Sequence, residues 1–204
     1  MKLKKTTLGI MILAGSILGT VTSCKKGCTD VAATNYDPDA KRDDKNNPCV
    51  FDTSDDWYSS VEVGNKTYRQ ITGTISSNQT INAADNWLIS GGVFVANGAT
   101  LTIEAGSTIY TANDGTTPFL SVKQGGKLMA NGTATLPIVF TPVKDNPQAG
   151  EWGGIIINGK APINAGETAE GEGGTGVYGG TDANDNSGTL RYVRVEYAGK
   201  ILGT

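Results

Sequence analysis

One pattern recurs along this chain of 204 residues and constrains its fold more than any other feature. It consists of two apolar residues separated by one position, a glycine three positions later, and another apolar residue three positions after the glycine. Copies occupy residues 93–101, 101–109 and 120–128, with a looser fourth copy at 193–201. Apolar residues at period two fit a strand with one buried face, and glycine suits the corner that follows. The repeat therefore predicts a solenoid whose coils each contribute several short strands and bury their apolar faces against one another.

Alternation within and around these copies assigns side chains to the interior or to the surface. The expected inward positions are Val93, Val95, Leu101, Ile103, Ile109, Leu120, Val122, Leu128, Ile138, Phe140, Ile155, Ile157, Val193 and Val195. The expected outward positions are Thr102, Glu104, Ser121, Lys123, Arg194 and Glu196. If the second and third copies lie on adjacent coils, Glu104 and Lys123 become neighbours of opposite charge. A β-sandwich is the competing fold, but it gives no reason for a corner glycine at one fixed offset.

The composition favours an all-β body and argues against nucleic acid as a partner. The chain has 28 glycines and only 18% charged residues, and long helical periodicity is missing. Its 20 acidic residues outnumber 17 basic ones, and three of the basic residues lie within the first five positions. Because nucleic-acid affinity comes largely from neutralising phosphates with basic side chains, we expect no nucleic-acid partner.

Residues 1–23 have the layout of a secretory leader. Three lysines precede an apolar stretch at residues 8–21, which is shorter than the ~20 apolar residues of a membrane span. The sequence VTSC at residues 21–24 resembles the lipobox of bacterial lipoproteins, in which cleavage before the cysteine leaves an acylated N-terminus. The resemblance implies a lipid on Cys24, the membrane as a partner, and a location at the outer membrane or cell surface. An ordinary secretory leader is the competing interpretation.

The other two cysteines then form a pair. With Cys24 carrying lipid, Cys28 and Cys49 are the two thiols left of three, and an oxidising compartment favours a disulfide between them. A loop of this length gains about 3 kcal/mol in the chain-entropy model. We expect residues 24–56 to form a small module held by this disulfide, because apolar residues are too scarce there for a packed core.

The module carries a recognisable motif. Residues 27–49 resemble a disulfide-closed motif of bacterial surface and secreted proteins, GCTDxxAxNYxPxAxxDDxxC, although residues 45–48 stand where a shorter Gly-Ser is usual. Its aspartates are candidate oxygen ligands for calcium, and a solvated acidic stalk is the competing interpretation. These aspartates are Asp30, Asp37, Asp39, Asp43 and Asp44.

Four segments of the body match a known family. They are residues 98–109 (GATLTIEAGSTI), 137–141 (PIVFT), 151–164 (EWGGIIINGKAPIN) and 187–199 (SGTLRYVRVEYAG). From about residue 71 to its end, the chain resembles exported bacterial proteins, often lipoproteins, that are expected to fold as right-handed parallel β-helices. The resemblance implies such a β-helix over residues 57–204, displayed as a scaffold on the outer surface, and it implies no established reaction.

A Gly-rich, acidic stretch at residues 165–186 interrupts the body. It is too long for a corner and has almost no apolar residues, so we expect a loop carried by the coils. Asp182, Asn184, Asp185 and Asn186 gather hard oxygen ligands there and resemble the short calcium linker of cadherins. A plain turn is the competing interpretation. Calcium is the one cofactor that the sequence suggests.

Aromatic and charged residues near the end of the chain are candidates for ligand binding. These are Tyr178, Tyr192, Arg194 and Glu196, with Tyr197 as a further exposed aromatic. Strand packing is the competing interpretation for Tyr192 and Tyr197. The chain stops inside the fourth copy, at residues 200–204, without a polar or helical cap. Because an open coil exposes unpaired strands, we expect a truncated chain whose full version adds coils.

No residue pattern announces a reaction. The chain has no histidine, which excludes Ser-His-Asp and Cys-His systems and the usual zinc sites. The first hypothesis is a non-catalytic surface scaffold or adhesin that binds glycan or protein. The second is a calcium-assisted polysaccharide lyase or another carbohydrate-active enzyme, with Lys123, Arg191 or Arg194 as the base, and it rests on fold analogy alone.

Overall fold

The computed structural model describes residues 25–29, 35–49 and 57–203. The chain divides into two compact units, residues 1–53 and 54–204. The predicted leader, Cys24 and the candidate calcium ligand Asp30 lie outside the described residues. Among the described residues, no helix is long and apolar enough to cross a membrane.

The smaller unit is held by a disulfide and by polar side chains. Cys28 and Cys49 are bonded, as the sequence predicts, and Cys28 is the one buried apolar side chain among the described residues of this unit. Asp43 Oδ1 accepts hydrogen bonds from Thr29 Oγ1 at 2.7 Å and from Thr29 N at 3.0 Å. These bonds, the side-chain bond first, hold the pKa of Asp43 below its ordinary value. Asp37 accepts from Lys25 Nζ at 2.9 Å, so two of the candidate calcium ligands serve internal contacts.

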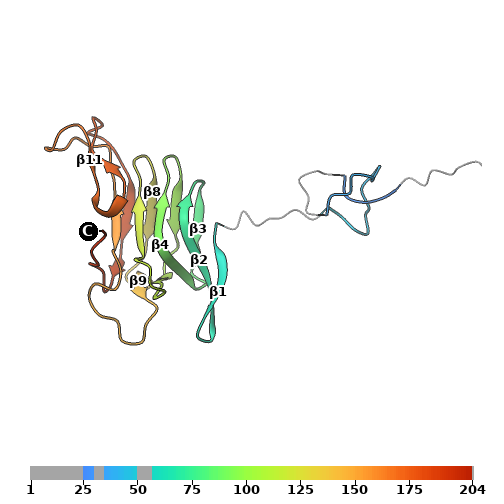
Figure 1. Cartoon of the computed structure of the whole chain (residues 1–204), viewed down its shortest axis with the longest axis horizontal. Coiled ribbons are helices and arrows are strands. Elements are labelled where there is room, and N and C mark those ends of the chain that lie inside the picture. The colour runs from blue at the N-terminus through green and yellow to red at the C-terminus, as the bar shows by residue number, and fades with distance from the viewer. Residues whose placement is uncertain (1–24, 30–34, 50–56, 204) are drawn as a thin grey trace, which may run out of the picture. The chain divides into compact units, whose positions relative to one another are not determined.

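The larger unit is built from strands that stack in three ladders (Figure 1). The first ladder contains β2 (Lys66–Ile75), β4 (Trp87–Val95), β6 (Thr108–Thr111), β9 (Ile138–Pro142) and β14 (Val193–Val195). The second contains the C-terminal parts of β2 (residues 73–75) and β4 (residues 92–95), followed by β7 (Phe119–Val122) and β10 (Ile155–Ile157). The third contains β3 (Gln79–Ile81), β5 (Thr100–Ile103), β8 (Lys127–Asn131) and β13 (Gly188–Arg191).

Two hairpins depart from the expected parallel arrangement. β1 (Ser59–Val63) pairs antiparallel with β2 through a turn at Gly64, whose φ is +62°. β11 (Ala169–Glu170) and β12 (Val177–Tyr178) pair antiparallel around a 3-10 helix, η1 (Glu172–Gly174). The sheets are therefore mixed, and the described part of the chain is all-β without an α-helix.

The corner glycines behave as the repeat predicts. Gly98, Gly106 and Gly125 have φ values of +83°, +85° and +76°, in a region that glycine enters without a Cβ clash. Each closes a strand so that the chain turns into the next ladder. The fourth copy has alanine at this position, and there Tyr197 adopts the left-handed backbone instead, with φ at +57°.

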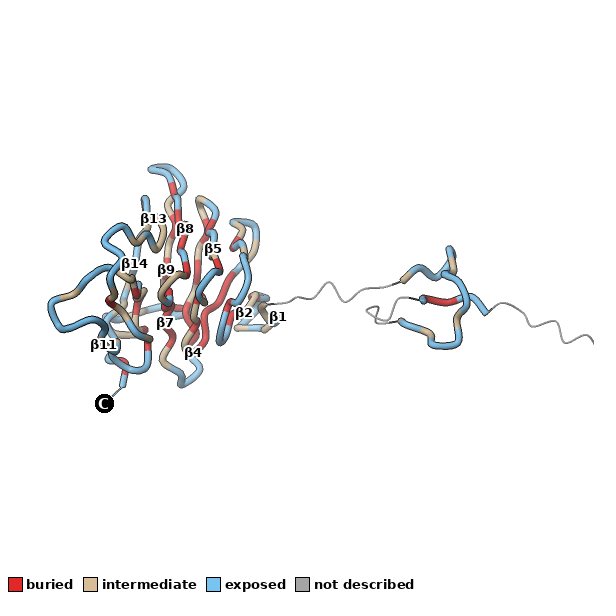
Figure 2. Tube along the Cα trace, turned by 90° about the horizontal axis from the view of Figure 1, so that it is seen from above, coloured by how far each residue is buried: buried red, intermediate tan, exposed pale blue. Residues whose placement is uncertain are grey.

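In-register stacking of aliphatic side chains forms the interior. The buried residues follow one another across the stacked strands (Figure 2). Val95 lies opposite Val122, which lies opposite Ile157, and Leu101 lies opposite Leu128. Full burial of such a side chain stabilises by roughly 1.5–3 kcal/mol. The first ten predicted inward residues, from Val93 to Phe140 in that list, are 2% exposed or less. This confirms the predicted interior for those ten.

The last four predicted inward residues are correctly oriented but incompletely covered. Val193 and Val195 stand in register over Ile138 and Phe140, yet Val195 is 46% exposed. Ile157 is 42% exposed, and Ile155 and Val193 are intermediate. β10 and β14 are the last described strands of their ladders, so a neighbouring strand packs against one side of these residues only.

Aromatic side chains close the other end of the stack. Trp57 stacks on Trp87 with ring centroids 5.0 Å apart, and Tyr58 meets Trp87 edge to face at 5.3 Å. The Arg69 guanidinium lies 4.8 Å from the centre of the Tyr58 ring. β1 pairs with residues 66–70 of β2 at the same end. Trp57 and Tyr58 pack against the apolar core there, so aromatic rings and a paired strand partly cover this end of the stack.

The expected contact between Glu104 and Lys123 is wrong. β5 pairs with β8, whereas β7, which precedes Lys123, pairs with β4. Leu101, where the second repeat copy begins, therefore lies opposite Leu128, where the third copy ends. The two copies do not pair from their first residues. Glu104 Oε2 instead accepts from Ala83 N at 3.0 Å, and Lys123 Nζ lies 4.5 Å from the centre of the Phe94 ring.

Replacing Leu128 by alanine should lower the free energy of unfolding by about 2–5 kcal/mol, because it leaves a cavity in a closed stack. Leu128 is fully buried and opposite Leu101. Leu136→Ala is the matched control, since it removes the same atoms from a side chain that is 55% exposed, and it should cost about 0.5 kcal/mol or less. Urea unfolding measures both, and equal losses would contradict the stacked interior.

Candidate functional site

The excursion expected at residues 165–186 is an ordered flap that lies on the outer face of β7. Ser121 Oγ donates to the Thr175 carbonyl at 2.6 Å, and Asn158 Nδ2 donates to the same carbonyl at 2.9 Å. Ser121, Asn158 and Thr175 are all 2% exposed or less. Ser121 therefore points outward as predicted, but it is buried because the flap covers it. Buried polar groups that satisfy one another in this way fix the flap in one position.

Three of the four predicted calcium ligands hold the backbone of the flap. Asp185 Oδ2 accepts from Lys160 N at 2.8 Å, and Asp182 Oδ1 accepts from Asn184 N at 3.0 Å. Asn186 Oδ1 accepts from Gly188 N at 2.8 Å. Within the described residues, no group of three or more His, Cys, Asp or Glu side chains is placed to hold a metal ion. A calcium site at Asp182, Asn184, Asp185 and Asn186 stays a prediction.

Hollows lie on both sides of the flap. One, of about 470 Å³, is lined by residues that include Lys123, Gln124 and Glu170. The other, of about 400 Å³, contains Tyr178 beside Asn158 and Lys200. Tyr178 is therefore in a concave surface, as expected of a binding residue.

Asp185→Ala should loosen the flap, because it removes the acceptor for Lys160 N and for Ser187 Oγ, which lies 3.3 Å away. Amide hydrogen exchange at Lys160 measures the effect, and we expect protection to fall about tenfold or more, as for a lost charge-assisted hydrogen bond. Asp182→Ala is the matched control, since it removes a bond within the flap only. Unchanged protection at Lys160 in the Asp185 variant would contradict this anchor.

The other predicted ligand-binding residues gather on β14. Arg194 and Glu196 form an ion pair on the outward side of the strand. Tyr192 precedes the strand and is 53% exposed, and Tyr197 follows it and is 41% exposed. The structure thus brings Tyr192, Arg194 and Glu196 together with Tyr197, while Tyr178 lines a different surface. Tyr192 and Tyr197 are thus both exposed, and ligand binding by these residues stays a prediction.

Both tyrosines have an unusual backbone. The φ angle is +50° at Tyr192 and +57° at Tyr197, and they are the two described residues other than glycine with positive φ. Hydrogen bonds fix both corners: Ile138 N donates to the Tyr192 carbonyl and Glu151 N to the Tyr197 carbonyl, each at 3.0 Å. A non-glycine residue in this region costs roughly 1–2 kcal/mol.

The outward face of the first ladder connects β14 to a groove at the opposite end. In register, Thr141 of β9 lies opposite Tyr110 of β6, Tyr110 opposite Leu88 of β4, and Leu88 opposite Gln70 of β2. The backbone N–H of Glu196 bonds the Phe140 carbonyl at 2.9 Å and continues this row. One continuous outer surface therefore runs across the coils.

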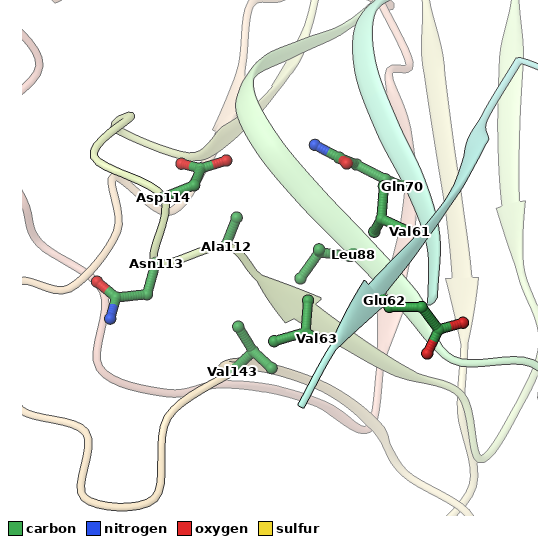
Figure 3. A pocket seen from close by; sticks show the side chains of 9 residues that line it. All are labelled: Val61, Glu62, Val63, Gln70, Leu88, Ala112, Asn113, Asp114 and Val143. Atoms are coloured by element: carbon green, nitrogen blue, oxygen red, sulfur yellow. The ribbon is translucent and has the colours of Figure 1, made fainter. Parts of the chain in front are cut away.

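The groove lies beside the β1–β2 hairpin. It consists of two adjoining hollows of about 320 and 580 Å³ that share Val63 and Val143. Figure 3 shows the apolar side chains of the smaller hollow grouped together, with Asp114 and Glu62 on opposite sides. The residues that line the smaller hollow are Val61, Glu62, Val63, Gln70, Leu88, Ala112, Asn113, Asp114 and Val143.

Two features give the groove its chemistry. Tyr68 and Tyr110 meet edge to face at 5.4 Å beneath the larger hollow, and burial raises the pKa of Tyr68. Asp114 accepts hydrogen bonds from Ser90 Oγ at 2.5 Å and from Thr116 Oγ1 at 2.6 Å. These bonds, the one from Ser90 first, hold the pKa of Asp114 below its ordinary value. Asp114 is an anionic group of the smaller hollow, whereas Lys66, Lys144 and Asp145 line the larger one.

The sequence pattern does not predict this groove. Its one sequence signal is a set of apolar residues at outward positions, namely Tyr68, Leu88 and Tyr110, which form a second small apolar cluster with Ala112. An outward apolar residue on a solenoid marks a covered or functional surface. The repeat pattern does not show which segment covers these residues.

Comparison with known proteins agrees with this architecture. Residues 73–203, more than half of the chain, match the family described as the pectate-lyase-like β-helix domain. The chain belongs to this family, and the predicted β-helix body is confirmed at this level. No curated protein and no solved structure matches the chain.

Proposed function

We propose that this protein is a lipid-anchored surface β-helix that binds glycan chains without cleaving them. The proposed anchor is Cys24, and the proposed location is the outer membrane or cell surface, both supported by the leader and the VTSC sequence. The proposed body is a right-handed parallel solenoid, supported by the parallel ladders and by family membership. The binding surface is the outward side of β14 with its flanking tyrosines.

One observation carries the proposal: two exposed tyrosines are kept in left-handed backbone positions at the two ends of β14. At other corners of this fold glycine occupies such positions at no steric cost, as at Gly98 and Gly125. Backbone strain that is kept at exposed residues indicates that their side chains have a function, such as ligand binding. A pair of rings with a charged pair between them suits a sugar chain, because rings stack on apolar sugar faces while Arg194 and Glu196 bond hydroxyl groups.

Glycan fits this surface better than a folded protein partner. The surface is narrow, since it spans one strand and its two corners, and protein interfaces usually bury about 800 Å² per partner. Its outward row continues along Thr141 and Tyr110 towards the groove, so an extended chain has room to follow the coils. The family description, which refers to a pectate lyase, supports a carbohydrate ligand.

Replacing Tyr192 and Tyr197 by glycine should abolish glycan binding without lowering the melting temperature. Glycine relieves the left-handed strain, which is worth roughly 1–2 kcal/mol per residue, while loss of each ring should weaken affinity about tenfold or more. A glycan array selects the ligand, and isothermal titration and thermal melting follow the variants. Tyr36→Gly is the control, since Tyr36 is an exposed tyrosine at 41% in the other unit. Full affinity in the double variant would contradict the proposal.

A carbohydrate-active enzyme is the second candidate, favoured by the family description. Two of the bases named for it are engaged elsewhere: Arg194 is paired with Glu196, and Lys123 lies over the Phe94 ring. We therefore expect no turnover when polygalacturonate and calcium are incubated with the protein. Absorbance of unsaturated products and a reducing-end assay measure this. Product formation that Arg191→Ala or Lys123→Ala abolishes would overturn the non-catalytic proposal.

A further inference from the structure

A free strand edge borders the groove. Within the described residues, β1 pairs with β2 and with no other strand. In an antiparallel pair, alternate residues direct their N–H and C=O groups away from the partner. About half of the main-chain groups of β1 therefore face the open side. Such an edge pairs readily with an added extended segment.

The floor of the groove matches alternate side chains of an extended peptide. Val61 and Val63 of β1 pack from one side against Leu88, and Ala112 and Val143 close the other side (Figure 3). The smaller hollow, of about 320 Å³, continues into the larger one past Val63 and Val143. A strand laid beside β1 would direct every second side chain to this apolar floor.

The charge of the smaller hollow selects among extended peptides. Asp114 lines it, and its lining residues include no lysine or arginine. Glu62 is also at the rim, but its carboxylate points away from the apolar side chains and accepts a hydrogen bond from Thr67 Oγ1 (Figure 3). Asp114 is ionised at neutral pH, and the hydrogen bonds from Ser90 and Thr116 lower its pKa further. A basic side chain at one end of a bound segment would find the Asp114 carboxylate at the rim.

We propose that this groove binds an extended peptide that adds a strand to the free edge of β1, inserts alternate apolar side chains over Leu88 and Ala112, and places a basic side chain near Asp114. This site is separate from the surface on β14, and it does not rest on glycan binding there.

Synthetic peptides test the proposal with the leaderless protein. The probe is a six-residue peptide with alternating valine and threonine between terminal lysines. We expect it to bind, to protect the amides of β1 from hydrogen exchange, and to lose affinity about tenfold or more on Asn113→Lys, which adds a positive charge to an exposed lining residue. Asn97→Lys is the matched control, since Asn97 is exposed and lies in a different hollow.

Two further peptides distinguish strand addition from other binding. Glutamate in place of the lysines should abolish binding through repulsion by Asp114, and a central proline should abolish it because proline cannot donate to the ladder. The proposal is overturned if the lysine peptide does not bind, if all three peptides bind equally, or if β1 remains unprotected. It is also overturned if an oligogalacturonate, and no peptide, protects β1.

Discussion

Contact between one coil and the next is the interaction on which the larger unit depends. No coil encloses its own aliphatic side chains: Val122 is buried because Val95 lies on one side of it and Ile157 on the other. Burial is therefore shared between neighbours, and each strand is stabilised by a residue far away in the sequence. The same contacts fix the outward side chains, because alternation along a strand places Tyr110 outward once Ile109 is inside.

The sequence predicted those parts of the fold that depend on local spacing. Period-two apolar residues and the glycine offset specified the interior from Val93 to Phe140 and the left-handed corners at Gly98 and Gly125. Pairing between coils was not predictable in the same way. Glu104 and Lys123 were expected to meet, but which strands stack depends on the length of chain between them, and β5 lies against β8.

The candidate surfaces were predictable to different degrees. Arg194 and Glu196 were predicted to point outward, because they alternate with Val193 and Val195 along one strand. The burial of Ser121 was not predicted, because it depends on the flap that covers it. The sequence of the flap is Gly-rich with almost no apolar residues, so it resembles an ordinary loop. The groove was missed because it needs a hairpin, β1 with β2, to fold beside outward residues that belong to other coils.

The lengths of the connections have a consequence for how such a protein diversifies. Trp87 stacks on Ile109, Ile109 on Phe140 and Phe140 on Val195, while the chain between successive partners grows longer at each step. The stack tolerates these longer connections because the added residues extend outward from a corner, and the next strand still pairs in the same register. The flap over β7 is one such insertion. New surface chemistry can thus be inserted by mutation at a bend while the buried column underneath is inherited unchanged.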